Sequence, residues 1–354
     1  MPSISPSPNR SGLAKKANRY RFLSTLLSLL DRYLSLPLPK SPRLEIAIPS
    51  KVSKTPGSIE LLIYTGSTPL CPRHNNPPLP ARPVLLNFHG GGFSIGHAQD
   101  DARWASTVLK SYPDAVVVSV NYRLAPEHPF PVALEDSVDA ILWLWQHADL
   151  YNLDKKRFAV SGFSAGGNLA LAVPIRLHEE LQKERWAGLG KIELAGLIAF
   201  YPSVDWTRTR AERDATNPVA AKKSMISPAM YKFFDESYLL VAGLPRRRGT
   251  GRVDMSHPYL SPGLATESLL LTAYPEAVAI YTCGWDQLLV EGNAFRERLE
   301  GFMGQEKMGR VGGFVVEDVP HGFDKKPSFW KGNKARERMY GDAVRQLEGM
   351  WKVD

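Results

Sequence analysis

A serine inside a G-x-S-x-G pentapeptide is the first feature of this chain that could perform chemistry. The pentapeptide is Gly162-Phe163-Ser164-Ala165-Gly166. It follows a short β-like run at 157–161 and precedes a helix-like run from 167 to about 182, the strand–turn–helix context that holds a nucleophilic serine on a sharp turn. The same spacing also occurs by chance in structural turns. Its interpretation therefore depends on what other residues the chain supplies.

A nucleophilic serine needs a base to take its proton, and the base needs an acid to orient it. His321 follows an apolar run at 314–319, and Asp286 lies just beyond another at 277–281. Taken singly, the aspartate could cap a helix and the histidine could be a surface residue. Together with Ser164 they follow the Ser–Asp–His order of α/β-hydrolases, each directly after a predicted strand. The joint pattern predicts a catalytic triad.

Donors for a developing oxyanion are also available. His89-Gly90-Gly91-Gly92 follows the apolar run 84–88, and consecutive glycines let backbone N–H groups turn toward one point. We predict that Gly91 and Gly92 act as oxyanion donors together with Ala165, at the positive start of the serine helix. The alternatives are a flexible loop or a phosphate-binding turn. The dinucleotide pattern G-x-G-x-x-G does not fit this loop, and the sequence contains no G-x-x-x-x-G-K-[ST] phosphate loop.

The elements that must position these residues alternate between strand and helix. This alternation indicates βαβ units and a mostly parallel sheet covered on both faces, with sites at the carboxyl ends of its strands. Pro174 lies inside the serine helix and predicts a kink or an early end. Strands are predicted at 43–48, 58–64, 84–88, 115–120, 157–161, 194–201, 277–281 and 314–319, and helices at 100–110, 132–147, 167–182, 228–240, 288–302 and 335–351.

The domain organisation follows from where the alternation is lost. Residues 41–202 and 256–354 are predicted as two parts of one core, and 203–255 as a cap insertion between them. Residues 1–40 are predicted as a flexible segment followed by an amphipathic helix. Within this segment, residues 1–20 are basic and rich in Ser, Pro and Asn, and their start is expected to be disordered.

A leucine stripe distinguishes residues 21–36. We expect this helix to lie over the mouth of the active site, with membrane-surface contact or organelle targeting as the alternatives. The apolar run is too short to span a bilayer, and no small-residue cleavage site follows it. The stripe is formed by Leu23, Leu26, Leu27, Leu30 and Leu34.

Composition excludes several classes of function. The chain has 354 residues, a formal charge of +8 and 23% charged residues, ordinary for a globular protein. Its basic residues are scattered and no zinc-finger spacing occurs, so no nucleic-acid partner is predicted. The two cysteines, Cys71 and Cys283, form neither a disulfide framework nor a metal quartet. We therefore predict a reducing compartment, the cytoplasm.

The motifs together resemble the hormone-sensitive-lipase-like branch of the α/β-hydrolases, from about Pro83 to Phe323. This branch includes microbial carboxylesterases, arylacetamide deacetylases and plant carboxylesterases. The resemblance implies an α/β-hydrolase fold with an eight-stranded, mostly parallel sheet flanked by helices, a helical cap built partly from the N-terminus, and ester hydrolysis without metal or cofactor. The motifs that carry it are His89–Gly92, Tyr122–Pro131, Gly162–Gly167, Asp286 and His321-Gly322-Phe323.

Two positions depart from the pattern of that branch. Phe163 stands where most members carry Asp, Glu or Thr, and Val290 stands where an acidic residue commonly precedes the glutamate, here Glu291. Both departures leave the subfamily and its substrate preference open. Within Tyr122–Pro131 we expect Arg123 and Glu127 to pair and to serve structure.

The expected function is hydrolysis of an apolar carboxylic ester with a short-to-medium acyl group or of a specialised metabolite. Two alternatives remain: acyl transfer or thioester chemistry with the same triad, and a ligand-binding receptor, as in plant gibberellin receptors, which lack the triad histidine. A homodimer and peripheral membrane contact through residues 21–36 are further partner hypotheses. The aromatic candidates for a substrate pocket are Phe93, Phe163, Tyr201 and Trp206.

Overall fold

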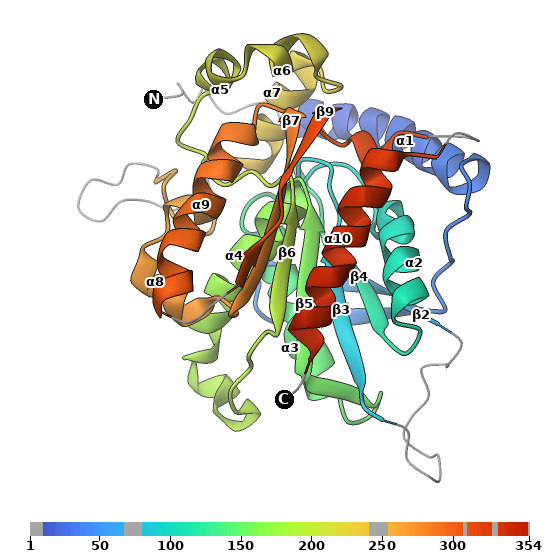
Figure 1. Ribbon diagram of the computed structural model, residues 1–354, viewed down its shortest axis with the longest axis vertical. Coiled ribbons are helices and arrows are strands. Elements are labelled where there is room, and N and C mark those ends of the chain that lie inside the picture. The colour runs from blue at the N-terminus through green and yellow to red at the C-terminus, as the bar shows by residue number, and fades with distance from the viewer. Residues whose placement is uncertain (1–9, 67–79, 241–253, 307–309, 328–331, 353–354) are drawn as a thin grey trace.

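A twisted, mostly parallel sheet with helices on both faces forms the body of the molecule (Figure 1). The computed structural model describes residues 10–66, 80–240, 254–306, 310–327 and 332–352. The sheet runs in the order β1-β2-β4-β3-β5-β6-β7-β8, and β9 pairs with β7. The strands are β1 (Leu44–Pro49), β2 (Ser58–Thr65), β3 (Arg82–Phe88), β4 (Val116–Asn121), β5 (Leu153–Phe163), β6 (Gly196–Phe200), β7 (Ala277–Trp285), β8 (Arg310–Gly312) and β9 (Val315–Pro320).

The two ends of the sheet differ in direction. β1 and β2 pair antiparallel with each other, β2 pairs antiparallel with β4, and the remaining pairings are parallel. The α/β-hydrolase expectation is therefore confirmed, but the described sheet has nine strands instead of eight. The additional strand is β8, whose three residues pair with Ala277–Ala279 of β7.

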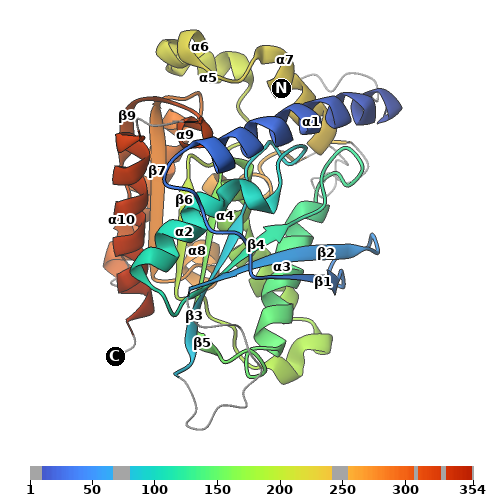
Figure 2. The ribbon, with the colours of Figure 1, turned by 90° about the vertical axis from the view of Figure 1, so that its right-hand side faces the viewer.

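Ten α-helices surround the sheet in the described part of the chain. They are α1 (Arg10–Leu34), α2 (Ala102–Ser111), α3 (Val132–Gln146), α4 (Ala165–Leu181), α5 (Arg210–Thr216), α6 (Pro218–Lys223), α7 (Pro228–Tyr238), α8 (Glu267–Ala273), α9 (Leu289–Glu306) and α10 (Lys334–Trp351). In Figures 1 and 2, α5, α6 and α7 lie beyond the carboxyl ends of the parallel strands, and α1 crosses the outside of the molecule near them.

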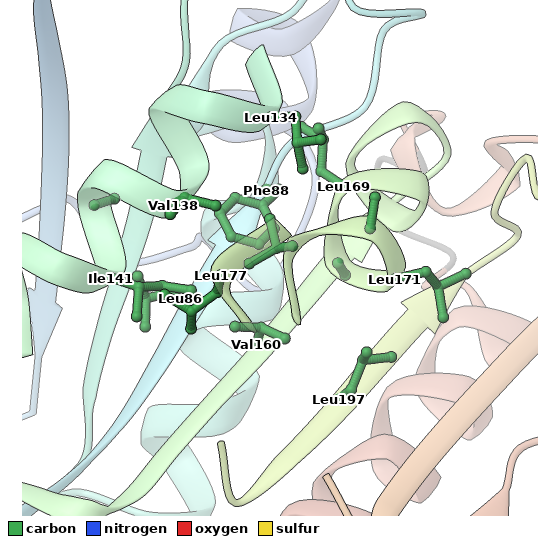
Figure 3. Packing of buried hydrophobic residues seen from close by; sticks show 14 of the residues in the cluster. Leu86, Phe88, Leu134, Val138, Ile141, Val160, Leu169, Leu171, Leu177 and Leu197 are labelled. Carbon is green, nitrogen blue, oxygen red and sulfur yellow. The ribbon is translucent and has the colours of Figure 1, made fainter. Parts of the chain in front are cut away.

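The sheet has a hydrophobic core on each face, and the central strands contribute alternate side chains to the two cores. In β3, Leu86 and Phe88 point to one face and Leu85 to the other. The first face packs on α3 and α4, where Figure 3 shows Leu134, Val138 and Leu169 around Phe88. The opposite face packs on α2 and α10. This two-sided burial holds the carboxyl ends of the strands in fixed positions.

The expected start of the first helix was wrong. α1 begins at Arg10 and not at residue 21, because Leu13 and Ala17 pack on Phe233 and Phe234 of α7. α4 runs through the buried Pro174 to Leu181, so it does not end early. No helix among the described residues is long and apolar enough to cross a bilayer.

Candidate active site

Ser164 lies on the sharp turn between β5 and α4. Its backbone has φ 55° and ψ −113°, a region that L-residues rarely adopt. Its N–H donates to the carbonyl oxygen of Phe200 at 2.8 Å, which fixes the turn against β6. A Cβ on Gly162 would lie 2.0 Å from the carbonyl oxygen of Gly166, and one on Gly166 would lie 2.0 Å from that of Phe88. The turn therefore requires glycine at both positions.

The structure brings Ser164, His321 and Asp286 together in one chain of hydrogen bonds. Ser164 Oγ lies 2.7 Å from His321 Nε2, and His321 Nδ1 lies 2.6 Å from Asp286 Oδ2. Asp286 and His321 are 2% and 6% exposed. With Nδ1–H donating to the carboxylate, Nε2 is free to accept the serine proton. The arrangement is therefore suited to generating a serine nucleophile.

Hydrogen bonds hold Asp286 and its loop in place from two sides. Its Oδ1 accepts the backbone N–H of Leu288 at 3.0 Å. Asn217, between α5 and α6, donates its side-chain amide to the carbonyl oxygens of Gly284 and Asp286 at 3.0 and 2.9 Å. These bonds restrict the loop after β7, so the carboxylate faces the imidazole. Sequence reasoning missed Asn217; an Asn-Pro pair that begins a helix is the signal that marks it as a cap residue.

The glycine loop after β3 runs beside the nucleophile. A Cβ on Gly90 would lie 3.5 Å from Cβ of Ser164. Gly91 and Gly92 have φ 114° and 57°, which turn the backbone as an anion-binding loop requires. In the described part of the chain, their N–H groups donate to no protein acceptor. This loop and the N-terminus of α4, which begins at Ala165, thus face the same serine.

His89 is a structural histidine. It is fully buried, its ring stacks on Tyr122 with centroids 4.2 Å apart, and its Nδ1 contacts the carbonyl oxygen of Gly90 at 2.7 Å. The Tyr122 hydroxyl donates to the carbonyl oxygen of His89 at 2.7 Å. Burial lowers the pKa of His89 to about 3, so the ring stays neutral at physiological pH. Its contacts are with the backbone of the glycine loop and with Tyr122.

The aromatic candidates separate into two groups. Phe93 stacks on Tyr238 of α7 with centroids 3.7 Å apart and lies 6.3 Å from the ring of Trp206. Tyr201 presents its ring to His321 with centroids 4.9 Å apart. These three therefore lie around the glycine loop and the imidazole. All are nearly or fully buried in this conformation.

Phe163 does not belong to that group. Its ring is fully buried, stacks on Phe200 with centroids 4.3 Å apart and packs on Tyr340 of α10. The expectation that it lines a substrate pocket is therefore wrong. The side chain before the nucleophile points to the α2–α10 face of the sheet, because alternation along β5 puts it on the same side as Ala159.

A buried charged network lies beneath Phe163, and sequence reasoning missed it. Lys325 Nζ lies 3.4 Å from the centroid of the Phe163 ring, 2.6 Å from Asp101 Oδ1 and 3.1 Å from Asp324 Oδ2. Asp324 also accepts the hydroxyl of Tyr201 at 2.5 Å. The network thereby joins the turn that carries His321 to the turn that carries Ser164. It also joins the His321 turn to the helix that follows the glycine loop. The nearest sequence signal is the Asp-Lys pair directly after His321-Gly322-Phe323.

Burial and charge determine the protonation of this network. Burial raises the pKa of Asp101 to about 6 although Lys325 opposes the shift. Burial also favours protonated Asp324, but Lys325 and the hydroxyls of Tyr201 and Tyr340 outweigh it and keep the pKa below its ordinary value. The two carboxylates raise the pKa of Lys325 against the effect of burial. At neutral pH the ammonium therefore lies between carboxylates.

Arg123 and Glu127 do not pair as expected. Arg123 binds Asp136 of α3 at 2.7 Å, and Glu127 binds Arg21 of α1 at 2.7 Å. Arg21 also donates to the carbonyl oxygen of Ala125 at 2.8 Å. The segment 122–131 therefore connects α1 to the core. The pairing partners are distant in sequence, so spacing alone could not identify them.

Glu291 joins the core to α5. Its carboxylate is 2.8 Å from Arg213 and accepts the N–H of Val204 at 3.0 Å. Burial raises its pKa, although Arg213 opposes the shift. The neighbouring Val290 is partly exposed and is outside this pair. Valine in place of the usual acidic residue at position 290 therefore leaves the contacts of Glu291 unchanged.

Comparison with known proteins supports the resemblance to the α/β-hydrolases. Esterase LipI of Mycobacterium tuberculosis is 31% identical over 222 residues, 61% of this chain and 59% of LipI. Human hormone-sensitive lipase is 31% identical over 218 residues, 54% of this chain and 19% of that protein. The matches thus span about three fifths of LipI and one fifth of the human lipase.

Solved structures show the fold over most of the chain. A thermostable esterase from Pseudomonas putida is 20% identical with a TM-score of 0.71, and the alignment covers 96% of this chain and 91% of that one. A family model described as the alpha/beta hydrolase fold matches residues 85–325, from β3 to the turn after His321. Those residues hold the elbow, the glycine loop and both partners of the serine, so the chain belongs to the alpha/beta hydrolase fold family, in its hormone-sensitive-lipase-like branch.

Proposed function

We propose that this protein hydrolyses carboxylic esters through an acyl-enzyme on Ser164. The observation that carries the proposal is the continuous hydrogen-bonded path from Ser164 Oγ through the imidazole of His321 to Asp286, with distances of 2.7 and 2.6 Å. Relatives named esterase support the same reaction class.

Acylation begins when His321 Nε2 accepts the proton of Ser164 as its oxygen attacks the ester carbonyl carbon. Asp286 holds the imidazole and stabilises the imidazolium, without itself taking the proton. The N–H groups of Gly91, Gly92 and Ala165 bind the oxyanion of the tetrahedral intermediate. The imidazolium then protonates the leaving alcohol, which departs and leaves the acyl group on Ser164.

Deacylation repeats these steps with water as nucleophile. His321 takes a proton from water, the hydroxide oxygen attacks the acyl carbon, and the imidazolium returns a proton to Ser164 as the acid leaves. All steps use groups of this chain, the substrate and water.

We propose an apolar ester as the substrate. Phe93, Trp206 and Tyr238 form an aromatic group that begins directly after Gly92. An acyl or alcohol group held at the glycine loop would contact these rings, which favours apolar over charged substituents.

The experiment is hydrolysis of a series of p-nitrophenyl esters by the purified protein and Ser164→Ala. We expect the substitution to reduce kcat on the order of 10⁴-fold or more while circular dichroism stays unchanged. Ser268→Ala, an exposed serine on α8, is the matched control and should retain parent activity. Parent-rate hydrolysis by Ser164→Ala would refute the assignment, and appearance of the free acid as product distinguishes hydrolysis from acyl transfer.

A further inference from the structure

Large apolar side chains gather on the solvent side of α1. Phe22 and Tyr33 are 71% and 64% exposed, and Leu26 is 48% exposed. The leucines continue beyond the helix at Leu36 and Leu38. The outward side of α1 is formed by Phe22, Leu23, Leu26, Leu27, Tyr33 and Leu34. Contiguous exposed apolar surface of this kind marks an interaction site.

The helix is turned so that its polar side faces the protein. Arg21 binds Glu127, Ser28 donates to Asp100 at 2.5 Å, and Asp31 binds Arg103 at 2.8 Å. With Ser24 and Thr25, several of these residues line a cavity of about 690 Å³ between α1 and the loops after β3 and β4. The polar contacts fix the rotation of the helix, so the apolar side stays outward. A helix lies at these residues as expected, most leucines of its stripe face outward, and its position over the active-site mouth stays a prediction.

Charge on the outward side has one sign. Lys15, Lys16 and Arg19 are exposed in the first half of α1, directly before the apolar stretch. At 100° per residue, Lys15 and Arg19 share the side of the helix that carries Phe22, Leu26 and Tyr33. The single acidic residue of α1 is Asp31, which is buried against Arg103. A partner that covers this face must accept leucines and supply negative charge.

We propose that α1 binds the surface of an anionic phospholipid bilayer. A helix of 25 residues is about 37 Å long and would lie in the plane of the interface, with its apolar side among the acyl chains and its basic residues at the phosphates. A second copy of this chain fits less well, because it would bring the same basic and apolar residues and no anion. Binding of α1 to a bilayer does not require ester hydrolysis.

The test is sedimentation of the purified full-length protein with phospholipid vesicles. We expect binding to vesicles of 70% phosphatidylcholine and 30% phosphatidylserine. Binding to pure phosphatidylcholine should be much weaker, and 0.5 M NaCl should release protein from the anionic vesicles, because salt screens the attraction.

Three variants separate the contributions. Leu26→Ser should lower the vesicle partition coefficient about tenfold through lost apolar contact. Lys15→Ala/Lys16→Ala/Arg19→Ala should lower it on the order of a hundredfold on anionic vesicles alone. Leu150→Ser is the matched control: Leu150 is 46% exposed, almost as much as Leu26, but lies between α3 and β5. It should bind like the parent.

Hydrolysis of a soluble p-nitrophenyl ester monitors the integrity of every variant and should stay at the parent level. Failure of the parent to sediment with anionic vesicles would overturn the proposal, as would equal binding by Leu26→Ser and Leu150→Ser. A dimer in size-exclusion chromatography that Leu26→Ser dissociates would assign the face to a second copy and would equally overturn it.

Discussion

Gly92 has no space for a side chain in the loop that faces Ser164. Its φ is 57°, and a Cβ there would lie 2.3 Å from the ring of Phe234 on α7. The position therefore carries both a backbone and a packing requirement. Any side chain must move either the loop or α7.

We predict that Gly92→Ala lowers kcat about 10²- to 10³-fold, the usual effect of displacing one oxyanion donor. Steady-state kinetics with a p-nitrophenyl ester measures it. The matched control is Gly301→Ala on α9, where a Cβ meets nothing within 4 Å. Parent-level kcat in Gly92→Ala would remove this loop from the mechanism.

Lys325 is the second residue with a clear expected effect. Its ammonium lies between two buried carboxylates, Asp101 and Asp324, so Lys325→Met leaves both without their cation. Loss of one member of a buried ion pair costs about 3–5 kcal/mol of unfolding free energy. Because Lys325 belongs to the His321 turn, we also expect kcat to fall more than KM changes.

Urea unfolding and steady-state kinetics check both effects, with Lys326→Met as the control because Lys326 is exposed. An unfolding free energy equal to that of the parent would mean that solvent compensates the carboxylates. The network would then have no positioning role.

The catalytic candidates could be predicted from sequence because each follows an apolar strand, and parallel strands end at one edge. The role of Phe163 was mispredicted from its position next to the serine, although alternation along β5 points it to the opposite core. The Lys325 network and Asn217 depend on contacts between distant segments. Spacing along the chain contains no information about such contacts.

At the scale of elements, the end of α4 is held by a cluster around Glu180. This carboxylate is completely buried and lies 2.7 Å from Arg176 and 2.5 Å from Lys183, and it also binds Arg185. Trp186 donates its indole N–H at 2.9 Å. Burial alone would raise the pKa of Glu180, but these hydrogen bonds outweigh it and lower the pKa to about 2.

A folded-state pKa below the ordinary value of 4.5 means that the ionised glutamate stabilises the folded state above pH 4.5 and that this contribution is lost as the pH falls toward 2. We predict that Glu180→Gln is less stable than the parent at pH 7 and that the difference shrinks between pH 4.5 and 2. Denaturant unfolding across this range measures it. Glu184→Gln, at an exposed position nearby, should show no such trend, and a pH-independent difference for Glu180→Gln would contradict the assigned pKa.

Most core elements could be predicted from hydrophobic pattern, with ends displaced by a few residues. Short elements could not: β8 has three residues, and α5 and α6 have seven and six. Periodicity needs a longer window, so their capping residues, Thr209 and Asn217, are the stronger sequence signal. The rotation of α1 could not be predicted from its leucine stripe, because it depends on ion pairs to distant residues that hold its polar side inward.

At the scale of the whole molecule, the site is assembled from four segments that are distant along the chain: 89–92, 164–165, 286 and 321. Each follows a different parallel strand, and the two-sided core fixes the relative positions of those strands. The aligned solved structures have this fold at about 20% identity. The fold is therefore shared although most side chains differ.

We propose above that His321 activates Ser164 as the nucleophile. The most direct measurement is covalent trapping with a fluorophosphonate, followed by mass spectrometry of the peptide that contains residue 164. We predict rapid, stoichiometric phosphonylation of Ser164 in the parent, no adduct there in Ser164→Ala, and labelling slowed by orders of magnitude in His321→Ala. An adduct on another residue would show that Ser164 is not the nucleophile, and equal labelling of Ser164 with and without the imidazole would show that His321 does not activate it.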